Sequence, residues 1–183
     1  MSDELIDICD KENNLTGEQK MKSEAHEKGL WHRAAHIWIY NSQGEVLLQL
    51  RAKEKLLFPN LWDVSVGGHV IAGEDPIDTG IRELEEEIGL NVQKDDLYFF
   101  KIIKDQVVSQ GLKNNEFYYV YFLKYDGDPH KLKLQVEEVQ EIKFFPIEKI
   151  TKELKTKPEK FVAPYRDYWS EVLNEIKKIN PRI

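Results

Sequence analysis

The stretch from Pro76 to Ile88 constrains the fold of this chain more than any other. At 3.6 residues per turn, Glu83, Glu86 and Glu87 project from one face of a helix. A different face carries a stripe of apolar residues, namely Ile77, Ile81, Leu84 and Ile88. A helix of this kind packs its apolar face on a core and presents a row of carboxylates on the other side.

The surroundings of this helix alternate between strand and helix patterns, which indicates the α/β class. Asp75 is typical of a helix N-cap, and Gly89 of a helix end. Strands are predicted at 5–9, 15–17, 31–40, 45–50, 61–66, 97–104, 116–125 and 139–146, and helices at 18–28, 76–88, 147–155 and 165–178. Gly67 and Gly68 are expected to interrupt the strand that ends at Val66. The apolar stripe of the last helix, Tyr165, Trp169, Val172, Ile176 and Ile179, predicts packing on the core.

Composition narrows the class of protein. The chain has 183 residues, 33 Asp and Glu against 26 Lys and Arg, and a formal charge of −7, so a nucleic acid polymer is not an expected partner. No apolar run has the length of a signal peptide or a membrane span. Cys9 is the sole cysteine, which precludes an internal disulfide. We expect a single cytoplasmic domain over 1–183 with a small charged substrate, and its oligomeric state, a dimer included, is left open.

Much of the acidic surplus lies in one segment. From Gly68 to Leu90 there are seven acidic residues and one basic residue, Arg82. Clustered carboxylates raise one another's pKa and destabilise a fold unless a cation neutralises them. Mg²⁺ or Mn²⁺, which prefer oxygen ligands, would suit such a site. The alternative is an ordinary solvated helix face.

The spacing of this segment decides between these two interpretations. Gly68 is followed after five residues by Glu74, and after seven more by Arg-Glu-Leu-Glu-Glu-Glu-Ile-Gly-Leu at 82–90. This pattern resembles the signature of the Nudix hydrolase family at every defined position. The resemblance implies an α/β/α sandwich around a mixed sheet, with an N-terminal hairpin and helix extension at 1–30, a loop–helix–loop at 68–90 and a C-terminal helix at 164–179.

The resemblance also implies the chemistry. Glu83, Glu86 and Glu87 would be catalytic residues and ligands of Mg²⁺ or Mn²⁺, and Arg82 would orient their carboxylates. The implied reaction is hydrolysis of a diphosphate linkage in a nucleoside di- or triphosphate or a related small diphosphate. Metal ions make water a better nucleophile at phosphorus and compensate the charge on phosphate oxygens.

Further groups would complete such a site. The resemblance implies that the carbonyl of Gly67 joins the metal ligands and that Glu74 braces the loop against the helix. Members of the family recruit an extra glutamate from outside the signature as ligand or base. Glu116 is our first choice for this role and Glu138 the second.

The first part of the chain, from about Leu5 to Glu74, resembles one branch of the family, the isopentenyl-diphosphate isomerase-like proteins. The resemblance is carried by the segments 29–34 (Gly-Leu-Trp-His-Arg-Ala), 58–59, 61–62 and 65–69 (Ser-Val-Gly-Gly-His). Isomerases of this branch have a catalytic cysteine where this chain has Gly67. They also bind a metal through three histidines and two glutamates.

This chain keeps only part of that isomerase metal site. His32, His69 and Glu116 match, His26 is one residue out of register, and Asn114 stands in place of a glutamate. Because the cysteine and one glutamate are missing while the hydrolase signature is complete, hydrolysis is favoured. An isopentenyl-diphosphate isomerase and a non-catalytic ligand-binding Nudix module remain alternatives.

Three residues are predicted to bind substrate. Arg51 and Lys55 match positions that hold a diphosphate in the isomerases, although a pair of surface charges is an equally good interpretation. His69, beside two glycines, is the third. His32 and His36 share one face of a strand, where packed, hydrogen-bonded histidines are the more common finding.

Overall fold

The computed structural model describes residues 3–55, 57–109, 112–163 and 167–180. Within them, backbone pairing connects nine strands. The strands are β1 (Leu5–Cys9), β2 (Leu15–Met21), β3 (Trp31–Tyr40), β4 (Glu45–Arg51), β5 (Trp62–Asp63), β6 (Val66–His69), β7 (Leu97–Ser109), β8 (Leu112–Lys124) and β9 (Val139–Pro146).

The α-helices of the described residues are α1 (Lys22–Lys28), α2 (Pro76–Ile88), α3 (Ile147–Thr156) and α4 (Asp167–Ile179). Short 3₁₀ turns occupy Lys94–Asp96, Pro129–Lys131 and Pro158–Lys160. None of the helices found in the described part of the chain has the length and apolarity needed to cross a membrane.

Strand β3 is the centre of the sheet. It is antiparallel to β1, β4 and β6, and it is parallel to β8 over its whole length, from Trp31 beside Asn115 to Tyr40 beside Lys124. The sheet is therefore mixed, as the resemblance implied. The β-branched and aromatic residues of β3 suit a strand that is buried on both faces.

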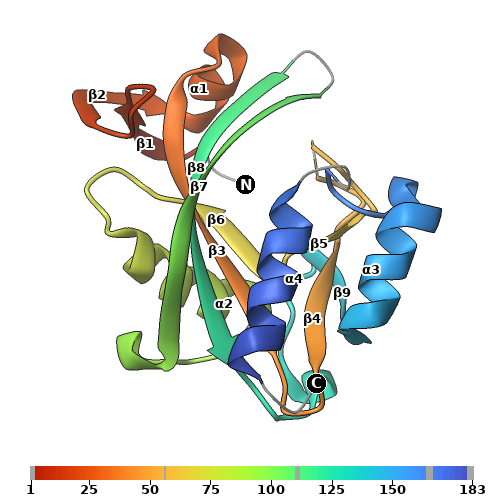
Figure 1. Ribbon diagram of the computed structural model, residues 1–183. Coiled ribbons are helices and arrows are strands. Elements are labelled where there is room, and N and C mark those ends of the chain that lie inside the picture. Colours follow the sequence, from red (N-terminus) through yellow and green to blue (C-terminus); the bar gives the residue numbers. More distant parts are fainter. Residues whose placement is uncertain (1–2, 56, 110–111, 164–166, 181–183) are drawn as a thin grey trace.

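Alternate residues of β3 contribute to two cores. Trp38 packs edge-on against Trp169 of α4, with ring centroids 5.1 Å apart, in a core that also includes α3 residues. Ile37 and Ile39 point the other way, into a core with Leu84 and Ile88 of α2. Helices thus cover both faces of the sheet, with α4 in front and α2 behind in Figure 1. The α/β/α fold class is confirmed, and the packing of Trp169, Val172 and Ile176 with it.

Helix α2 has the boundaries that its caps predict. The carboxylate of Asp75 accepts a hydrogen bond from the N–H of Ile77, at 3.4 Å, and Pro76 occupies the first turn. Gly89 adopts a left-handed conformation, φ 68°, and its N–H donates to the carbonyl oxygen of Glu85. The loop before the helix follows directly from β6, so the acidic helix face lies against this strand.

Three predictions of local structure are wrong. The strand expected at 61–66 is two strands, β5 and β6, separated by Val64 and Ser65. Residues 18–21 belong to strand β2, not to a helix, because they pair with β1, and the side chain of Gln19 donates to Asp7 at 2.9 Å. Gly67 and Gly68 do not interrupt a strand; they lie inside β6 and pair with His36 and Ala35 of β3. Tyr165 lies outside the described residues.

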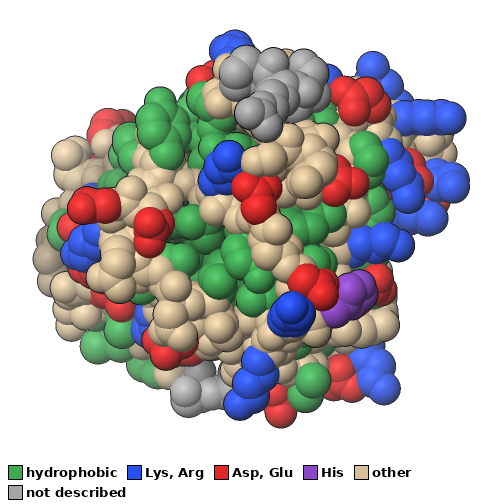
Figure 2. All heavy atoms as spheres, turned by 90° about the horizontal axis from the view of Figure 1, so that it is seen from below, with side chains coloured by type: hydrophobic (Ala, Val, Ile, Leu, Met, Phe, Trp, Pro, Cys, Tyr) green, Lys and Arg blue, Asp and Glu red, His purple; other side chains and the backbone are tan. Residues whose placement is uncertain are grey.

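The underside of the molecule shows how charge is distributed. Figure 2 shows hydrophobic side chains in the middle of this face, surrounded by charged ones. Lys and Arg side chains gather on the right of the view, the side of α3, which carries Lys149, Lys152 and Lys155. This basic edge lies on the opposite side of the molecule from α1 and β2.

Candidate active site

Helix α2 and strand β6 form one wall of a polar cleft with a volume of about 330 Å³. Its lining includes the glutamates of the helix and residues from five other parts of the chain: Glu4, Lys22, Lys55, Gly67, Gly68, His69, Glu83, Glu86, Glu87, Gln135 and Glu138. The structure therefore brings together all three predicted helix ligands, Gly67, His69 and Lys55. It also adds Glu138 to this group.

Two of the three helix carboxylates are buried. Glu83 and Glu87 are 9% and 5% exposed, whereas the side chain of Glu86 is 52% exposed. Burial raises the pKa of Glu87 well above its ordinary value, and the neighbouring Glu83 raises it further. Burial also raises the pKa of Glu83, although Arg82 opposes the shift. A site with several carboxylate oxygens that repel one another when ionised suits a hard divalent cation. Glu83, Glu86 and Glu87 would be its ligands.

Arg82 holds the acidic helix face and the preceding loop together. Its Nη1 lies 2.7 Å from Glu83 and 3.3 Å from Glu86, and its Nη2 lies 3.2 Å from Glu74. Glu74 also accepts a hydrogen bond from the hydroxyl of Thr79, at 2.6 Å. These are the contacts expected if Arg82 orients the carboxylates and Glu74 braces the loop against the helix.

Two lysines line the cleft beside acidic partners. Lys55 pairs with Glu138, and Lys22 pairs with Glu4 at 2.7 Å. Lys22 and Glu4 were missed by the sequence analysis, because they lie in the N-terminal extension, far from the signature. No local pattern marks them; contacts of β1 with β3 and with the loop after β6 bring the extension to this side of the sheet.

Arg51 does not share the cleft with Lys55. Its Nη1 lies 3.0 Å from Asp63 and its Nη2 donates to the carbonyl of Leu57 at 3.0 Å. Arg51 lines a second pocket, on the other side of Gly67 and Gly68. The two predicted diphosphate-binding cations are therefore held by different partners.

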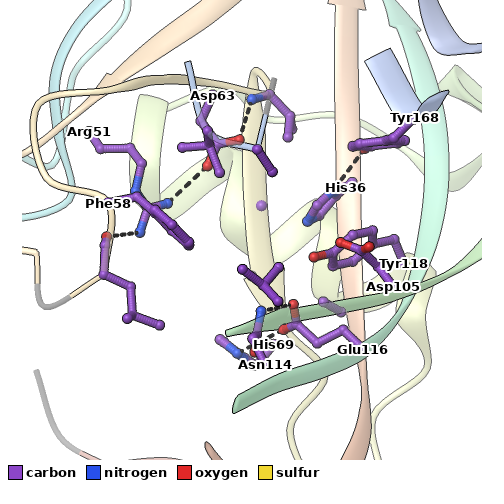
Figure 3. Close-up of a pocket in the computed structure, with 18 of the residues that line it drawn as sticks. His36, Arg51, Phe58, Asp63, His69, Asp105, Asn114, Glu116, Tyr118 and Tyr168 are labelled. Carbon is purple, nitrogen blue, oxygen red and sulfur yellow. Dashed lines mark hydrogen bonds and ion pairs between the residues drawn. The ribbon is translucent and has the colours of Figure 1, made fainter. Parts of the chain in front are cut away.

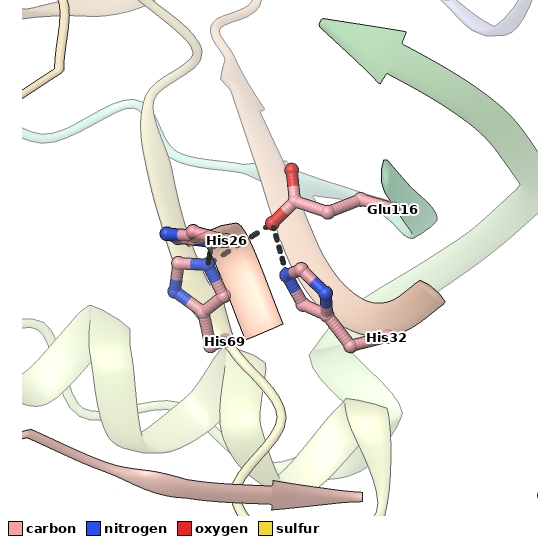
Figure 4. Close-up of side chains that lie close together, drawn as sticks. All are labelled: His26, His32, His69 and Glu116. Atoms are coloured by element: carbon pink, nitrogen blue, oxygen red, sulfur yellow. Dashed lines mark hydrogen bonds and ion pairs between the residues drawn. The ribbon is translucent and has the colours of Figure 1, made fainter. Parts of the chain in front are cut away.

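Glu116 lies apart from the helix glutamates, in a cluster with three histidines (Figure 4). Its Oε1 is 3.3 Å from Nε2 of His32 and 3.1 Å from Nε2 of His69. His26 completes the cluster from helix α1, and one ligand atom from each of the four residues lies within 4.8 Å of the others. Although His26 is one residue out of register in the sequence, the fold thus places it beside His32 and His69.

Nitrogen and oxygen donor atoms converge in this cluster. Nδ1 of His32 lies 2.9 Å from the carbonyl oxygen of Leu30, and since a carbonyl only accepts, neutral His32 carries its proton there. Its Nε2 turns a lone pair toward Glu116 and has no hydrogen-bond partner among the described residues. The Nε2 atoms of His26 and His69 face each other at 3.2 Å. A transition metal such as Zn²⁺ fits this set of nitrogen and oxygen donors.

The protonation states of the cluster also suit a metal. Burial, together with the neighbouring rings of His69 and His32, lowers the pKa of His26 to about 4. Burial alone would raise the pKa of Glu116, but hydrogen bonds from His32 and His69, when these rings carry a proton on Nε2, hold it well below its ordinary value. Neutral imidazoles and an ionised carboxylate are the forms that bind metal ions.

The second pocket is lined by residues of β3, β6, β8 and α4, among others, and has a volume of about 130 Å³ (Figure 3). His36 stacks on Tyr118, with ring centroids 4.0 Å apart at 18°. The hydroxyl of Tyr168 accepts from Trp38 Nε1 at 2.8 Å and lies 2.7 Å from Nδ1 of His36. The hydroxyl can accept from both rings or donate to His36, so the direction of the His36 hydrogen bond depends on the tautomer of the imidazole.

His36 predicts acid sensitivity of the fold. Burial lowers its pKa below the ordinary value, so its contribution to stability is fully present above about pH 6.5, the unfolded pKa, and decreases as the pH falls below it. We expect the urea midpoint of the metal-free protein to fall between pH 7.5 and pH 5.5 by more than that of His36→Gln. Equal falls in the two proteins would show that His36 does not contribute.

Residues 30–165 match the NUDIX domain family. The chain belongs to the Nudix family. It is 37% identical over 153 residues to Nudix hydrolase 3 of Arabidopsis thaliana, a match that covers 81% of this chain but only 20% of that protein's length. It is also 34% identical over 161 residues to the isopentenyl-diphosphate Delta-isomerase of Serratia proteamaculans, covering 88% of this chain and 87% of the isomerase.

Solved structures agree with this assignment at the level of the fold. A protein of Deinococcus radiodurans, DR0079, superposes on this Nudix chain with a TM-score of 0.68 and 23% identity, covering 94% of this chain and 99% of DR0079. An Ap4A hydrolase of C. elegans superposes with a TM-score of 0.55 and 23% identity, covering 83% and 99%. Hydrolases and isomerases both occur among the relatives, so the site residues must discriminate between them.

Proposed function

We propose that this Nudix protein hydrolyses a diphosphate linkage in a small molecule, a nucleoside di- or triphosphate or a related diphosphate, by attack of water at phosphorus. The observation that carries the proposal is the gathering of Glu83, Glu86 and Glu87 in one cleft with two lysines. Such a cleft offers anionic oxygens for Mg²⁺ or Mn²⁺ and cations for phosphate. The hydrolase signature on α2 is complete.

Each part of the cleft has a task in this reaction. A bound divalent cation lowers the pKa of water and compensates the charge on phosphate oxygens. Lys22 and Lys55 are placed to exchange their carboxylate partners for phosphate oxygens. Glu138, 8% exposed and facing the cleft, is a better candidate than Glu116 to accept the proton of the attacking water, because Glu116 is engaged by His32 and His69.

The test is a panel of diphosphates incubated with Mg²⁺ or Mn²⁺. The panel includes nucleoside di- and triphosphates, dinucleotides, nucleotide sugars, thiamine diphosphate and isopentenyl diphosphate. We expect release of phosphate or a monophosphate from at least one compound, and loss of that release on addition of a chelator. Failure to cleave any member with either cation would contradict the proposal.

Binding of Mg²⁺ should also stabilise the fold. A ligand that binds only the folded state raises its stability by about 2.7 kcal/mol at one hundred times the dissociation constant. We therefore expect the melting temperature to rise with Mg²⁺ concentration, and to rise less in Glu83→Gln, which loses one predicted ligand. The measurement is differential scanning calorimetry of both proteins, with a chelator in the reference sample. An unchanged melting temperature in the wild type would argue against a cation in the cleft.

The cluster of His26, His32, His69 and Glu116 favours a second candidate function, isopentenyl-diphosphate isomerase. The position that holds the catalytic cysteine in isomerases is Gly67 here, which has no side chain to move a proton. A Cβ at Gly67 would approach Cδ2 of His36 to 3.2 Å, so the pocket is also shaped around a glycine. Exchange of labelled hydrogen into isopentenyl diphosphate without phosphate release would establish the isomerase and displace the hydrolase.

A further inference from the structure

The second pocket adjoins the cleft. Gly67, Gly68 and His69 of strand β6 line both cavities. A molecule whose diphosphate lies in the cleft can extend past these residues, because two of the three carry no side chain. The pocket is therefore positioned to receive the organic group of the substrate.

The size of the pocket limits that group. Its volume is about 130 Å³, close to the roughly 150 Å³ of an engineered protein cavity that holds one benzene molecule. A single six-membered ring fills such a space. A fused two-ring system is too large to enter completely.

The walls of the pocket offer flat aromatic surfaces. Figure 3 shows His36, Tyr118 and Tyr168 on one side of the pocket, with Arg51, Phe58 and Asp63 on the other. Aromatic side chains interact favourably with a planar ring in stacked or edge-on arrangements, and they gain less from a flexible aliphatic chain.

Two residues that line the pocket each have a buried polar atom, a donor in one and an acceptor in the other, with no hydrogen-bond partner among the described residues. They are Nε of Arg51 and Oδ1 of Asn114. The amide of Asn114 is oriented by Glu116, which accepts from its Nδ2, and this leaves the buried Oδ1 without a partner at the edge of the pocket. A hydrocarbon would leave both groups unpaired and shielded from water, which is unfavourable. A ring with nitrogen or exocyclic polar atoms can pair with them.

We propose that this pocket binds a single nitrogen-containing aromatic ring carried by the substrate diphosphate, in preference to a purine or an isopentenyl chain. The position of the diphosphate rests on the proposed function. The ring recognition rests on the volume, the aromatic walls and the two unpaired polar groups of the pocket.

The first experiment ranks ligands by equilibrium binding to Glu87→Gln, in which turnover is expected to be negligible. Cytidine diphosphate, thiamine diphosphate, adenosine diphosphate and isopentenyl diphosphate are titrated by calorimetry in the presence of Mg²⁺. We expect one or both of the single-ring ligands to bind at least tenfold more tightly than the other two, and their order separates a nucleotide ring from a thiazole-type ring. Equal or tighter binding of isopentenyl diphosphate or adenosine diphosphate would overturn the proposal.

A matched pair of substitutions tests the location. Val107 lines the pocket, whereas its neighbour Val108 is 74% exposed on the other face of β7. Val107→Phe should weaken binding of the preferred ring ligand at least tenfold, and Val108→Phe should leave it within twofold. Phe58→Ala removes one aromatic wall without introducing a larger side chain, and it should also weaken binding; it therefore serves as the test if Val107→Phe does not fold. Unchanged affinity in the pocket variants would refute the location.

The failure of this inference can be told apart from failure of the proposed function. If the wild-type protein cleaves diphosphates at similar rates whatever their organic group, the proposed hydrolysis is supported and the proposed ring pocket is refuted. If it cleaves none of them, but the ligand ranking and the Val107 effect hold, the pocket stands and hydrolysis is refuted.

Discussion

Glu87→Gln is expected to lower kcat on the true substrate by on the order of a thousandfold, or about 4 kcal/mol of transition-state stabilisation. Glu87 is buried and faces the cleft, and its carboxylate is one of the three that a divalent cation would bind. A glutamine has the same shape but no charge, so it removes the electrostatic contribution while the packing is kept. The measurement is Mg²⁺-dependent phosphate release at saturating substrate.

The metal-free stability of this variant separates catalysis from folding. Because burial raises the pKa of Glu87, the ionised form is unfavourable in the empty cleft, and Glu87→Gln should melt at the same temperature as the wild type or higher in a chelator. The matched control is Glu85→Gln, an exposed position on the same helix, which should retain wild-type activity. Wild-type turnover by Glu87→Gln would remove the mechanism.

Gly68→Ala is expected to reduce activity on the order of a hundredfold by displacing a carboxylate. A Cβ at this position would lie 2.2 Å from Cδ and Oε1 of Glu83, an approach that no real contact allows. Glu83 is the end of a flexible side chain, so the carboxylate rather than the backbone would move. We expect the apparent Mg²⁺ requirement to rise, which a titration of activity against Mg²⁺ would measure.

A second glycine provides the contrast. A Cβ at Gly80, in the middle of α2, would lie 2.7 Å from Cδ1 of Ile37 in the core. Gly80→Ala should therefore cost about 1–3 kcal/mol of stability through overpacking and leave the Mg²⁺ requirement unchanged. If Gly68→Ala also lost stability without a change in Mg²⁺ requirement, the close packing of β6 on Glu83 would have only a structural role.

The helix α2 could be predicted to the residue because its determinants are local. Asp75, Pro76 and Gly89 act within one turn of the helix ends, and the apolar stripe needs only a core to pack on. Residues 18–21 could not be predicted in the same way, because their helical composition is overridden by pairing with β1. Strand pairing between distant segments leaves little trace in a single sequence.

The candidate site likewise has parts that local sequence spacing predicts and parts that depend on contacts between distant segments. The three glutamates of α2 share a face by helical spacing, so their gathering was predictable. The approach of His26 to His69, which lie 43 positions apart in the chain, depends on how α1 docks on the sheet. The separation of Arg51 from Lys55 depends on Asp63 and Glu138, which hold their side chains in different cavities. Spacing alone contains none of this information.

The region of the chain that matches the family, 30–165, carries the acidic helix but not everything around it. Lys22 and His26 come before it in the chain, and Tyr168, whose hydroxyl meets His36, comes after it. Both ends of the polypeptide thus supply groups that would meet a substrate. If the proposed function holds, sequence changes at these flanks would alter which substrates the protein accepts while its acidic helix stays the same, which offers related proteins a route to new specificities.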